Sequence, residues 1–468
     1  MSQKIKLFEK QKSIYPKRVW GKYRKIKWIA MISIMSLYYL LPWVRWDRGE
    51  NFPDQAILID LPGRRAYFFN IEIWPQEVYY LTGILILAAI LLFFVTSLFG
   101  RVWCGYTCPQ TIWTDLFVWV ERIIQGDRNA RMKLDKSPWK FDKIWKKSLT
   151  HSVWLIIGLF TGGAWVLYFN DAPTIIPELL SFSASPMVVG WVISLTLSTY
   201  LMAGFARDQV CSLMCPYARF QSGMFDKDTL IVSYDVDRGE ERGKLQKGES
   251  FDDRGHCINC TQCVNVCPQG IDIRDGLQME CIACGLCIDA CNNVMEKIDL
   301  PKGLIRYDTE RNVEGRREGK LDKIKLLRPR SVYYALIIII VFSLMVYKLL
   351  NREMIGMNIL HDRNPLFVTL SDGNIRNGYD LKLVNKSHSD VTYSIKIVNL
   401  DSAKLKNREG AEINSVTVKA DSVRDYKVFV SAPIQEERKI DLIFEISLVD
   451  ENGVVLKKSV KNLFISKK

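Results

Sequence analysis

Five long apolar segments dominate the pattern of hydrophobic and polar positions along the chain. Each is long enough to cross a bilayer as one α-helix, which needs roughly 20 residues. Charged stretches flank all five, which disfavours the alternative of helices buried in a soluble core. The pattern therefore predicts five membrane-spanning helices, at about residues 26–44, 79–100, 151–169, 188–206 and 332–350.

Alternation of apolar and polar residues forms a second pattern, after the fifth segment. An alternation of period two indicates a β-strand with one buried face. It is found in three runs, at residues 391–397, 416–418 and 440–448. Turn-forming residues separate such runs, at residues 371–374, 409–410 and 451–453. About seven short strands at this spacing predict an all-β, immunoglobulin-like sandwich for residues 351–468.

The distribution of basic residues predicts how the spans are oriented. Lys and Arg number ten in residues 1–27 and ten in 101–149, but four in 45–78 and none in 170–187. Because loops rich in Lys and Arg stay in the cytoplasm, we expect the N-terminus inside and the loops at 45–78 and 170–187 outside. The same rule accounts for the net charge of +13. We see no basic patch with interleaved aromatic residues, so we expect no nucleic-acid partner.

Eight cysteines between residues 257 and 291 form two copies of one run, C-x2-C-x2-C-x3-C. This spacing supplies the soft, converging thiolates of a [4Fe–4S] cluster. In two-cluster ferredoxins the fourth cysteine of each run ligates the other cluster. That rule assigns one cluster to Cys257, Cys260, Cys263 and Cys291, and the second to Cys281, Cys284, Cys287 and Cys267. The first run ends in Cys-Pro, as the signature requires, whereas Asn292 follows the second.

Disulfides and structural zinc are the alternatives for these cysteines. The reducing cytoplasm disfavours disulfides, and a zinc site does not need the triplet loop twice. Between the runs, residues 270–274 (GIDIR) alternate and are expected to form the short strand of a ferredoxin hairpin. His256, beside Cys257, is expected to be an ordinary loop histidine, and His151 shows no haem pattern.

The four remaining cysteines form a repeat. Cys104 and Cys108, and likewise Cys211 and Cys215, lie in C-x3-C-P motifs that directly follow the second and fourth spans. On one α-helix, positions i and i+4 share a face, so each pair could present both sulfurs together. Three chemistries remain open for the quartet: a soft-metal site such as Cu(I), a further iron–sulfur cluster, or redox-active dithiols. Inert packing of small residues is the bland alternative.

Two smaller features lie close to these motifs. Arg101 and Arg207 precede the two pairs and are expected to lower the pKa of a neighbouring thiol. Residues 111–124 have an apolar face and predict a helix lying along the membrane surface. Both features are also compatible with a purely structural role at the cytoplasmic border.

The expected architecture is a five-span α-helical bundle with an inserted, cytoplasmic, ferredoxin-like 2[4Fe–4S] domain and a C-terminal sandwich. In order, we expect a basic cytoplasmic tail, a four-helix membrane region, the cluster domain, the fifth span and a periplasmic domain. Their expected bounds are residues 1–27, 28–206, 207–331, 332–350 and 351–468.

The order of these parts resembles a known family. WCGYTCPQ, CPYARFQSGMFDKDTLIVSYD, both cluster runs and GLIRYDTE at 303–310 are similar to the cytochrome c oxidase accessory proteins of the FixG/RdxA (CcoG) family. The resemblance implies a bacterial inner-membrane protein with two [4Fe–4S] clusters that supports assembly of the cbb3-type oxidase. It also implies reduction of Cu(II) to Cu(I) in the cytoplasm, so that a copper-exporting ATPase can deliver the metal.

The motifs and the resemblance leave three hypotheses for the function. The first is a cupric reductase in which Cys104, Cys108, Cys211 and Cys215 are the catalytic residues and the copper ion is the substrate. The second is a quinol dehydrogenase subunit, because the C-x3-C-P pairs also look like those of membrane quinol dehydrogenases. The third is an assembly scaffold whose outer β domain holds oxidase subunits. Two clusters are of no use to a scaffold, so the sequence favours the first two.

Overall fold

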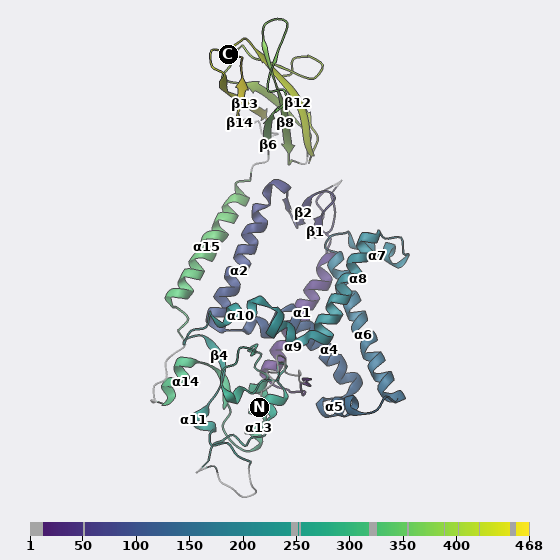
Figure 1. Cartoon of the computed structure of the whole chain (residues 1–468), viewed down its shortest axis with the longest axis vertical. Helices are drawn as coiled ribbons and strands as arrows, with labels where there is room; N and C mark the ends of the chain where they lie inside the picture. Colours follow the sequence, from purple (N-terminus) through teal and green to yellow (C-terminus); the bar gives the residue numbers. More distant parts are fainter. Residues whose placement is uncertain are drawn as a thin grey trace, which may run out of the picture. The chain divides into compact units, whose positions relative to one another are not determined.

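The computed structural model describes residues 13–49, 52–244, 251, 254–317, 325–352, 355–387, 389–400, 402–420, 422–449 and 455–467. The chain divides into two compact units, residues 1–345 and 346–468. Figure 1 shows the chain with many of its helices and strands labelled.

Among the described residues, five helices are long and apolar enough to cross a membrane. Each overlaps one of the predicted segments. They are α1 (Lys22–Leu40), α2 (Tyr79–Phe99), α6 (Phe141–Val166), α8 (Pro186–Leu201) and α15 (Pro329–Leu350). Helix α6 begins at Phe141 rather than near residue 151, because the Lys-rich stretch before the apolar run forms its first turns.

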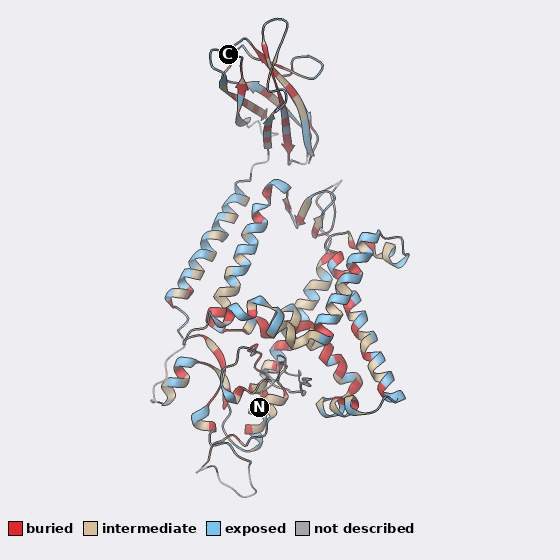
Figure 2. Cartoon of the chain, viewed as in Figure 1, coloured by how far each residue is buried: buried red, intermediate tan, exposed pale blue. Residues whose placement is uncertain are grey.

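The apolar surface of these helices is largely exposed. Leu85 on α2 is 61 % exposed and Ile339 on α15 is 62 % exposed. Figure 2 shows the same along most of both helices. Water would disfavour such a surface, whereas lipid tails would cover it at no cost. The burial pattern therefore agrees with a membrane protein.

Helices α6 and α8 approach each other closely at two glycines. A Cβ on Gly158 would lie 3.0 Å from the backbone oxygen of Thr196, and one on Gly162 would lie 2.9 Å from that of Val192. Small residues four apart allow such contacts between membrane helices.

The loops that were predicted to share one side of the membrane contact each other. Residues 57–73 fold into an antiparallel sheet of β1 (Ile57–Asp60), β2 (Arg65–Phe68) and β3 (Ile71–Ile73), and α7 (Ala172–Leu180) forms the other loop. The fully buried Gln55 joins them: its amide nitrogen donates to the Leu167 carbonyl at 2.6 Å, and its oxygen accepts from Ala172 at 3.0 Å.

Short helices follow the second and fourth spans. They are α3 (Val102–Tyr106), α4 (Pro109–Gln125) and α5 (Arg128–Lys136), and then α9 (Arg207–Gln209) and α10 (Pro216–Ser222), with π-helical turns at Met202–Ala206 and Val210–Met214. The predicted helix at 111–124 is confirmed as α4, but Ile112, Phe117 and Val120 on its apolar face pack against Trp154 and Ala203. Protein therefore covers much of the face that was expected to meet lipid.

The cysteine runs lie between two paired strands. Strand β4 (Leu230–Tyr234) pairs antiparallel with β5 (Ile305–Thr309). The helices around the runs are α11 (Val236–Gly239), α12 (Gln262–Asn265), α13 (Leu286–Lys297) and α14 (Glu310–Arg317). The expected strand at 270–274 is wrong. Asp272 accepts a hydrogen bond from the Arg274 amide and starts a 3-10 turn at Ile273–Asp275, so the segment is not extended.

The second unit is a β-sandwich. Its described residues contain nine strands, two more than the seven predicted. One sheet has the order β10-β12-β8-β6, with β7 paired to β8, and the other has the order β11-β9-β13-β14. The bounds are β6 (Ile355–His361), β7 (Val368–Thr369), β8 (Ile375–Asn385), β9 (Val391–Ile397), β10 (Lys404–Lys406), β11 (Ser415–Val418), β12 (Ser422–Ala432), β13 (Lys439–Val449) and β14 (Val455–Ile465).

The core of this sandwich comes from the alternating residues. Strands β9, β11 and β13 confirm the three predicted runs. Tyr379 and Phe444, one from each sheet, are fully buried with ring centres 5.2 Å apart. Gly373 and Gly410 have positive φ in the first two predicted turns, whereas the third, at 451–453, lies outside the described residues.

Candidate metal centres

The eight cysteines of the two runs lie close together, and their electrostatic interactions cross between the runs. Cys291, on α13, lies within electrostatic range of Cys257, Cys260 and Cys263. Cys267, the last cysteine of the first run, lies within range of Cys281 and Cys284 instead. The fourth cysteine of each run therefore meets the triplet of the other run.

A cavity marks the second group. Its lining includes four cysteines of that group, Cys267, Cys281, Cys284 and Cys287, together with Cys263 of the first group. Cys287 is in turn within electrostatic range of the other three and of Cys263. Cysteine sulfurs around such a cavity form a suitable donor set for an iron–sulfur cube.

Both runs have the same local backbone. The residues on either side of the middle cysteine are left-handed in each run: Asn259 and Thr261 around Cys260, and Ala283 and Gly285 around Cys284. A helix begins two residues after each middle cysteine, at Gln262 and at Leu286. These tight turns bring three thiols of one run together.

The missing proline after the second run has a visible effect. Pro268 follows Cys267, and no helix continues there. Asn292 allows α13 to continue through Cys291 to Lys297. The departure from the signature therefore lengthens the ligand helix and leaves Cys291 beside the first triplet.

The electrostatics of these thiols fit a cationic centre. Burial raises the pKa of Cys267 and of Cys291 to about 12, and that of Cys287 well above its usual range. Such thiols stay protonated unless a metal compensates their charge. Among the described residues, no three His, Cys, Asp or Glu side chains converge on a single-ion site. A cube suits this spacing, because each thiolate binds a different iron atom. The individual ligand assignments remain predictions.

The C-x3-C-P pairs do not lie on continuous helices. Cys104 lies inside α3, and Cys108 is the extended residue just before α4. In the same way Cys211 lies in a π-helical turn and Cys215 is the extended residue before α10. The expectation of two sulfurs on one helical face is therefore wrong. The proline after each second cysteine takes the first position of a new helix, where it needs no amide hydrogen.

The two pairs nevertheless lie near each other, although no three of the four described side chains converge on one point. Cys211 lies within electrostatic range of Cys104, Cys108 and Cys215. Cys104 is 7 % exposed, and its sulfur donates to the side-chain oxygen of Gln221 at 3.5 Å. Gln221 is fully buried, and its amide nitrogen meets no acceptor of good geometry in the described part of the chain. We call the four cysteines the quartet.

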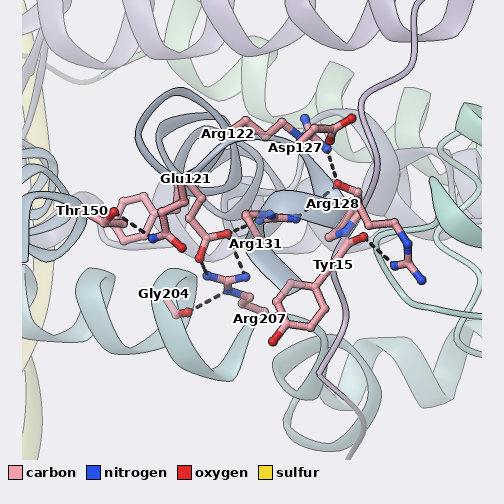
Figure 3. Close-up of polar contacts among 12 residues, drawn as sticks. Tyr15, Glu121, Arg122, Asp127, Arg128, Arg131, Thr150, Gly204 and Arg207 are labelled. Carbon is pink, nitrogen blue, oxygen red and sulfur yellow. Dashed lines mark hydrogen bonds and ion pairs between the residues drawn. The ribbon is translucent and has the colours of Figure 1, made fainter. Parts of the chain in front are cut away.

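The two arginines beside the quartet act differently from the expectation. Arg101 does favour the Cys104 thiolate, but burial outweighs it and the pKa of Cys104 is raised. Arg207 pairs with Glu121 at 2.7 Å and donates to the Gly204 carbonyl at 2.7 Å. Figure 3 shows Glu121 between the guanidinium groups of Arg131 and Arg207. Arg207 has a φ of 37°, a strained value that these contacts hold in place.

The two histidines have local partners. The Nδ1 atom of His256 accepts from the Arg238 guanidinium at 2.9 Å, and burial and this charge lower its pKa. His151 hydrogen-bonds the Tyr200 hydroxyl at 3.0 Å. These contacts agree with the ordinary roles that were expected.

Sequence reasoning missed three residues of this region: Gly105, Gln221 and Asp289. Asp289 lies inside the second run and accepts from the amides of Tyr23 and Arg24, so it joins the ligand helix α13 to the start of α1. The sequence shows only an acidic residue between two cysteines, and the partner of this residue lies more than 260 positions away.

Comparisons with known proteins place these features in a family. Residues 206–310 match the 4Fe-4S dicluster domain, residues 81–126 a 4Fe-4S binding domain, and residues 345–467 the IG-like fold at the C-terminus of FixG.

Relatives extend over almost the whole chain. The nitrogen fixation protein FixG of Rhizobium meliloti is 44 % identical over 91 % of this chain and 88 % of its own. Protein RdxB of Cereibacter sphaeroides is 46 % identical over 94 % of each. The ferredoxin-type protein NapH of Haemophilus influenzae is 24 % identical over 44 % of this chain and 65 % of its own. The chain therefore belongs to the FixG/RdxA family, and it is a membrane-associated iron–sulfur electron-transfer protein.

Proposed function

We propose that this protein reduces Cu(II) to Cu(I) at the quartet, in support of the maturation of a cbb3-type cytochrome c oxidase. The observation that carries the proposal is that Cys211 lies within electrostatic range of Cys104, Cys108 and Cys215, while Cys104 packs with Cys284 of the cysteine-rich domain. Four thiols from two repeated motifs supply soft donors, which prefer Cu(I) over Cu(II).

The chemistry requires one electron for each copper ion. The reduced iron–sulfur protein gives up one electron, Cu(II) takes it, and no bond to copper needs to break. The product binds thiolates more strongly than the reactant does, which favours the reaction at the quartet. Cys257, Cys260, Cys263 and Cys291 would hold one cube, and Cys267, Cys281, Cys284 and Cys287 the other, as stores of single electrons.

The predicted topology supports a cytoplasmic site for this reaction. The basic segments 1–27 and 101–149 favour a cytoplasmic side for the N-terminus, the quartet and the cluster domain. The protein would span the bacterial inner membrane five times, with residues 351–468 in the periplasm. Cu(I) formed on the cytoplasmic side would then pass to a copper-transporting ATPase, and oxidase subunits are the expected partners of the outer domain.

Replacing all four quartet cysteines by serine tests the proposal. The protein is reduced anaerobically with dithionite, freed of the reductant and mixed with Cu(II), and Cu(I) is followed with a chromogenic chelator. The variant should keep its iron and sulfide and lose copper reduction. Normal copper reduction by an iron-loaded variant would show that the quartet is not the copper site. Reduction of the wild-type protein by a quinol in proteoliposomes, with no reaction toward copper, would favour the dehydrogenase alternative.

A further inference from the structure

Gly105, next to Cys104, lies against the backbone of the second cysteine run. A Cβ at this position would lie 2.6 Å from the Ile282 oxygen, 3.0 Å from the Cys284 Cα and 3.2 Å from the Ala283 oxygen. Real Cβ atoms do not approach backbone atoms so closely. The helix α3 therefore reaches this loop only because residue 105 has no side chain.

Three side chains around this contact hydrogen-bond the same loop. The Tyr106 hydroxyl donates to the Cys284 carbonyl at 2.9 Å. Arg101 donates to the Met279 carbonyl, and Tyr307 from β5 donates to the Ala283 carbonyl. Each of these contacts falls on residues 279–284, the loop that carries two cysteines of the second group.

Packing connects the sulfurs on the two sides. Cys104 and Cys284 belong to one buried apolar cluster, in which Ile282 and Leu286 also take part. Cys257, Cys263 and Cys291 of the first group belong to a different cluster, built around Val232 and Met295, against which Cys281 and Cys287 also pack. Cys104 of the quartet is therefore packed with Cys284 of the second group.

We infer that Gly105 is a positioning residue that couples the quartet to the second cysteine group, Cys267, Cys281, Cys284 and Cys287, rather than to the first. This inference rests on the proposed function, since it names the group from which the quartet receives electrons. An iron–sulfur cluster held by the second group would supply the single electron that reduces one Cu(II) ion to Cu(I) at the quartet. Because electron transfer depends on close approach, a displaced loop slows this step without changing the copper ligands.

The test compares Gly105→Ala with Gly163→Ala in the full-length protein. Gly163 is a helical glycine with no atom within 4 Å of an added Cβ, so it is the matched control. In Gly105→Ala, alkylation of Cys104 by N-ethylmaleimide, measured by mass spectrometry on copper-free protein, should rise several-fold. Reoxidation of the dithionite-reduced protein by Cu(II) should slow by roughly tenfold to 100-fold. Iron content and Cu(I) affinity should match the control.

A milder variant covers the case in which Gly105→Ala loses its iron. Tyr106→Phe removes one hydrogen bond to the loop but keeps the packing of the ring. It should therefore raise the alkylation of Cys104 and slow the reoxidation by Cu(II) less than Gly105→Ala does. Unchanged alkylation and unchanged reoxidation in these variants would overturn the inference. A wild-type protein that does not reduce copper would overturn the proposed function instead, while the alkylation result would still report on the contact.

Discussion

The backbone amide of Arg24 donates a 2.8 Å hydrogen bond to a carboxylate oxygen of Asp289, which lies midway between Cys287 and Cys291. The other carboxylate oxygen accepts from the Tyr23 amide at 3.2 Å. A negative side chain at the first turn of α1 satisfies free amides and interacts favourably with the helix dipole. The first membrane helix thus begins on the helix that carries two cluster cysteines.

Replacing Asp289 by alanine should loosen this connection. Two helix-start amides lose their acceptor, which typically costs about 1–2 kcal/mol. We expect the visible absorbance of the iron–sulfur protein to be lost at a lower temperature in detergent. Glu296→Gln, on the exposed side of the same helix, is the control, since its partner Lys302 is also exposed. If both variants lost their visible absorbance at the same temperature, Asp289 would not hold the cysteine-rich domain to the start of α1.

Glu121 should matter more for stability, because it holds two arginines at once. Glu121→Gln removes a buried negative charge and leaves Arg131, whose side chain is 2 % exposed, without its ion pair. The expected loss is about 3–5 kcal/mol. The exposed pair of Lys146 with Asp142 offers a control, because Asp142→Asn should cost less than about 0.5 kcal/mol. Thermal unfolding in detergent measures the stability of both variants. Similar melting temperatures would contradict the stabilising role of Glu121.

Gln221 is predicted to affect the affinity for Cu(I) rather than the stability of the fold. Its oxygen and nitrogen can exchange places by rotation of the amide, so the unpartnered nitrogen can donate to a metal-bound Cys104 thiolate. A hydrogen bond to a charged group is worth about 1.5–3 kcal/mol. Gln221→Leu should therefore weaken Cu(I) binding by roughly tenfold or more while the fold keeps its stability. Competition with a Cu(I) chelator measures this, and an unchanged affinity would rule the hydrogen bond out.

The C-terminal β domain should be dispensable for copper reduction. A chain that lacks residues 355–468 keeps every cysteine and all five predicted spans. We expect it to reduce Cu(II) at the normal rate in vitro but to fail in oxidase maturation in cells. Loss of copper reduction in the truncated protein, with iron content intact, would show that the domain contributes to the reaction itself.

Much of the fold could be predicted from local patterns. Length and hydropathy located the five long apolar helices of the described residues, and period two located β9, β11 and β13. Local patterns gave the wrong secondary structure where a single adjacent residue decides the backbone conformation. The C-x3-C spacing suggested one helix, but the proline after Cys108 starts a new one. The alternation at 270–274 suggested a strand, but Asp272 caps a turn there.

The site residues that were missed depend on tertiary contacts. Gly105 is an ordinary small residue until the loop at 282–284 lies on it, and Gln221 becomes notable only through its burial beside Cys104. Arg207 was expected to lower the pKa of a neighbouring thiol, but its guanidinium group pairs with Glu121, 86 positions away. No pattern of spacing in one chain contains such pairings.

The most direct test of the account is the iron and acid-labile sulfide content of anaerobically purified protein, combined with EPR after reduction. Two cubes on the eight cysteines of the runs, with the quartet as a separate site, predict about eight irons for each chain. About twelve irons would make the quartet a third cube, and protein free of iron would contradict the account as a whole.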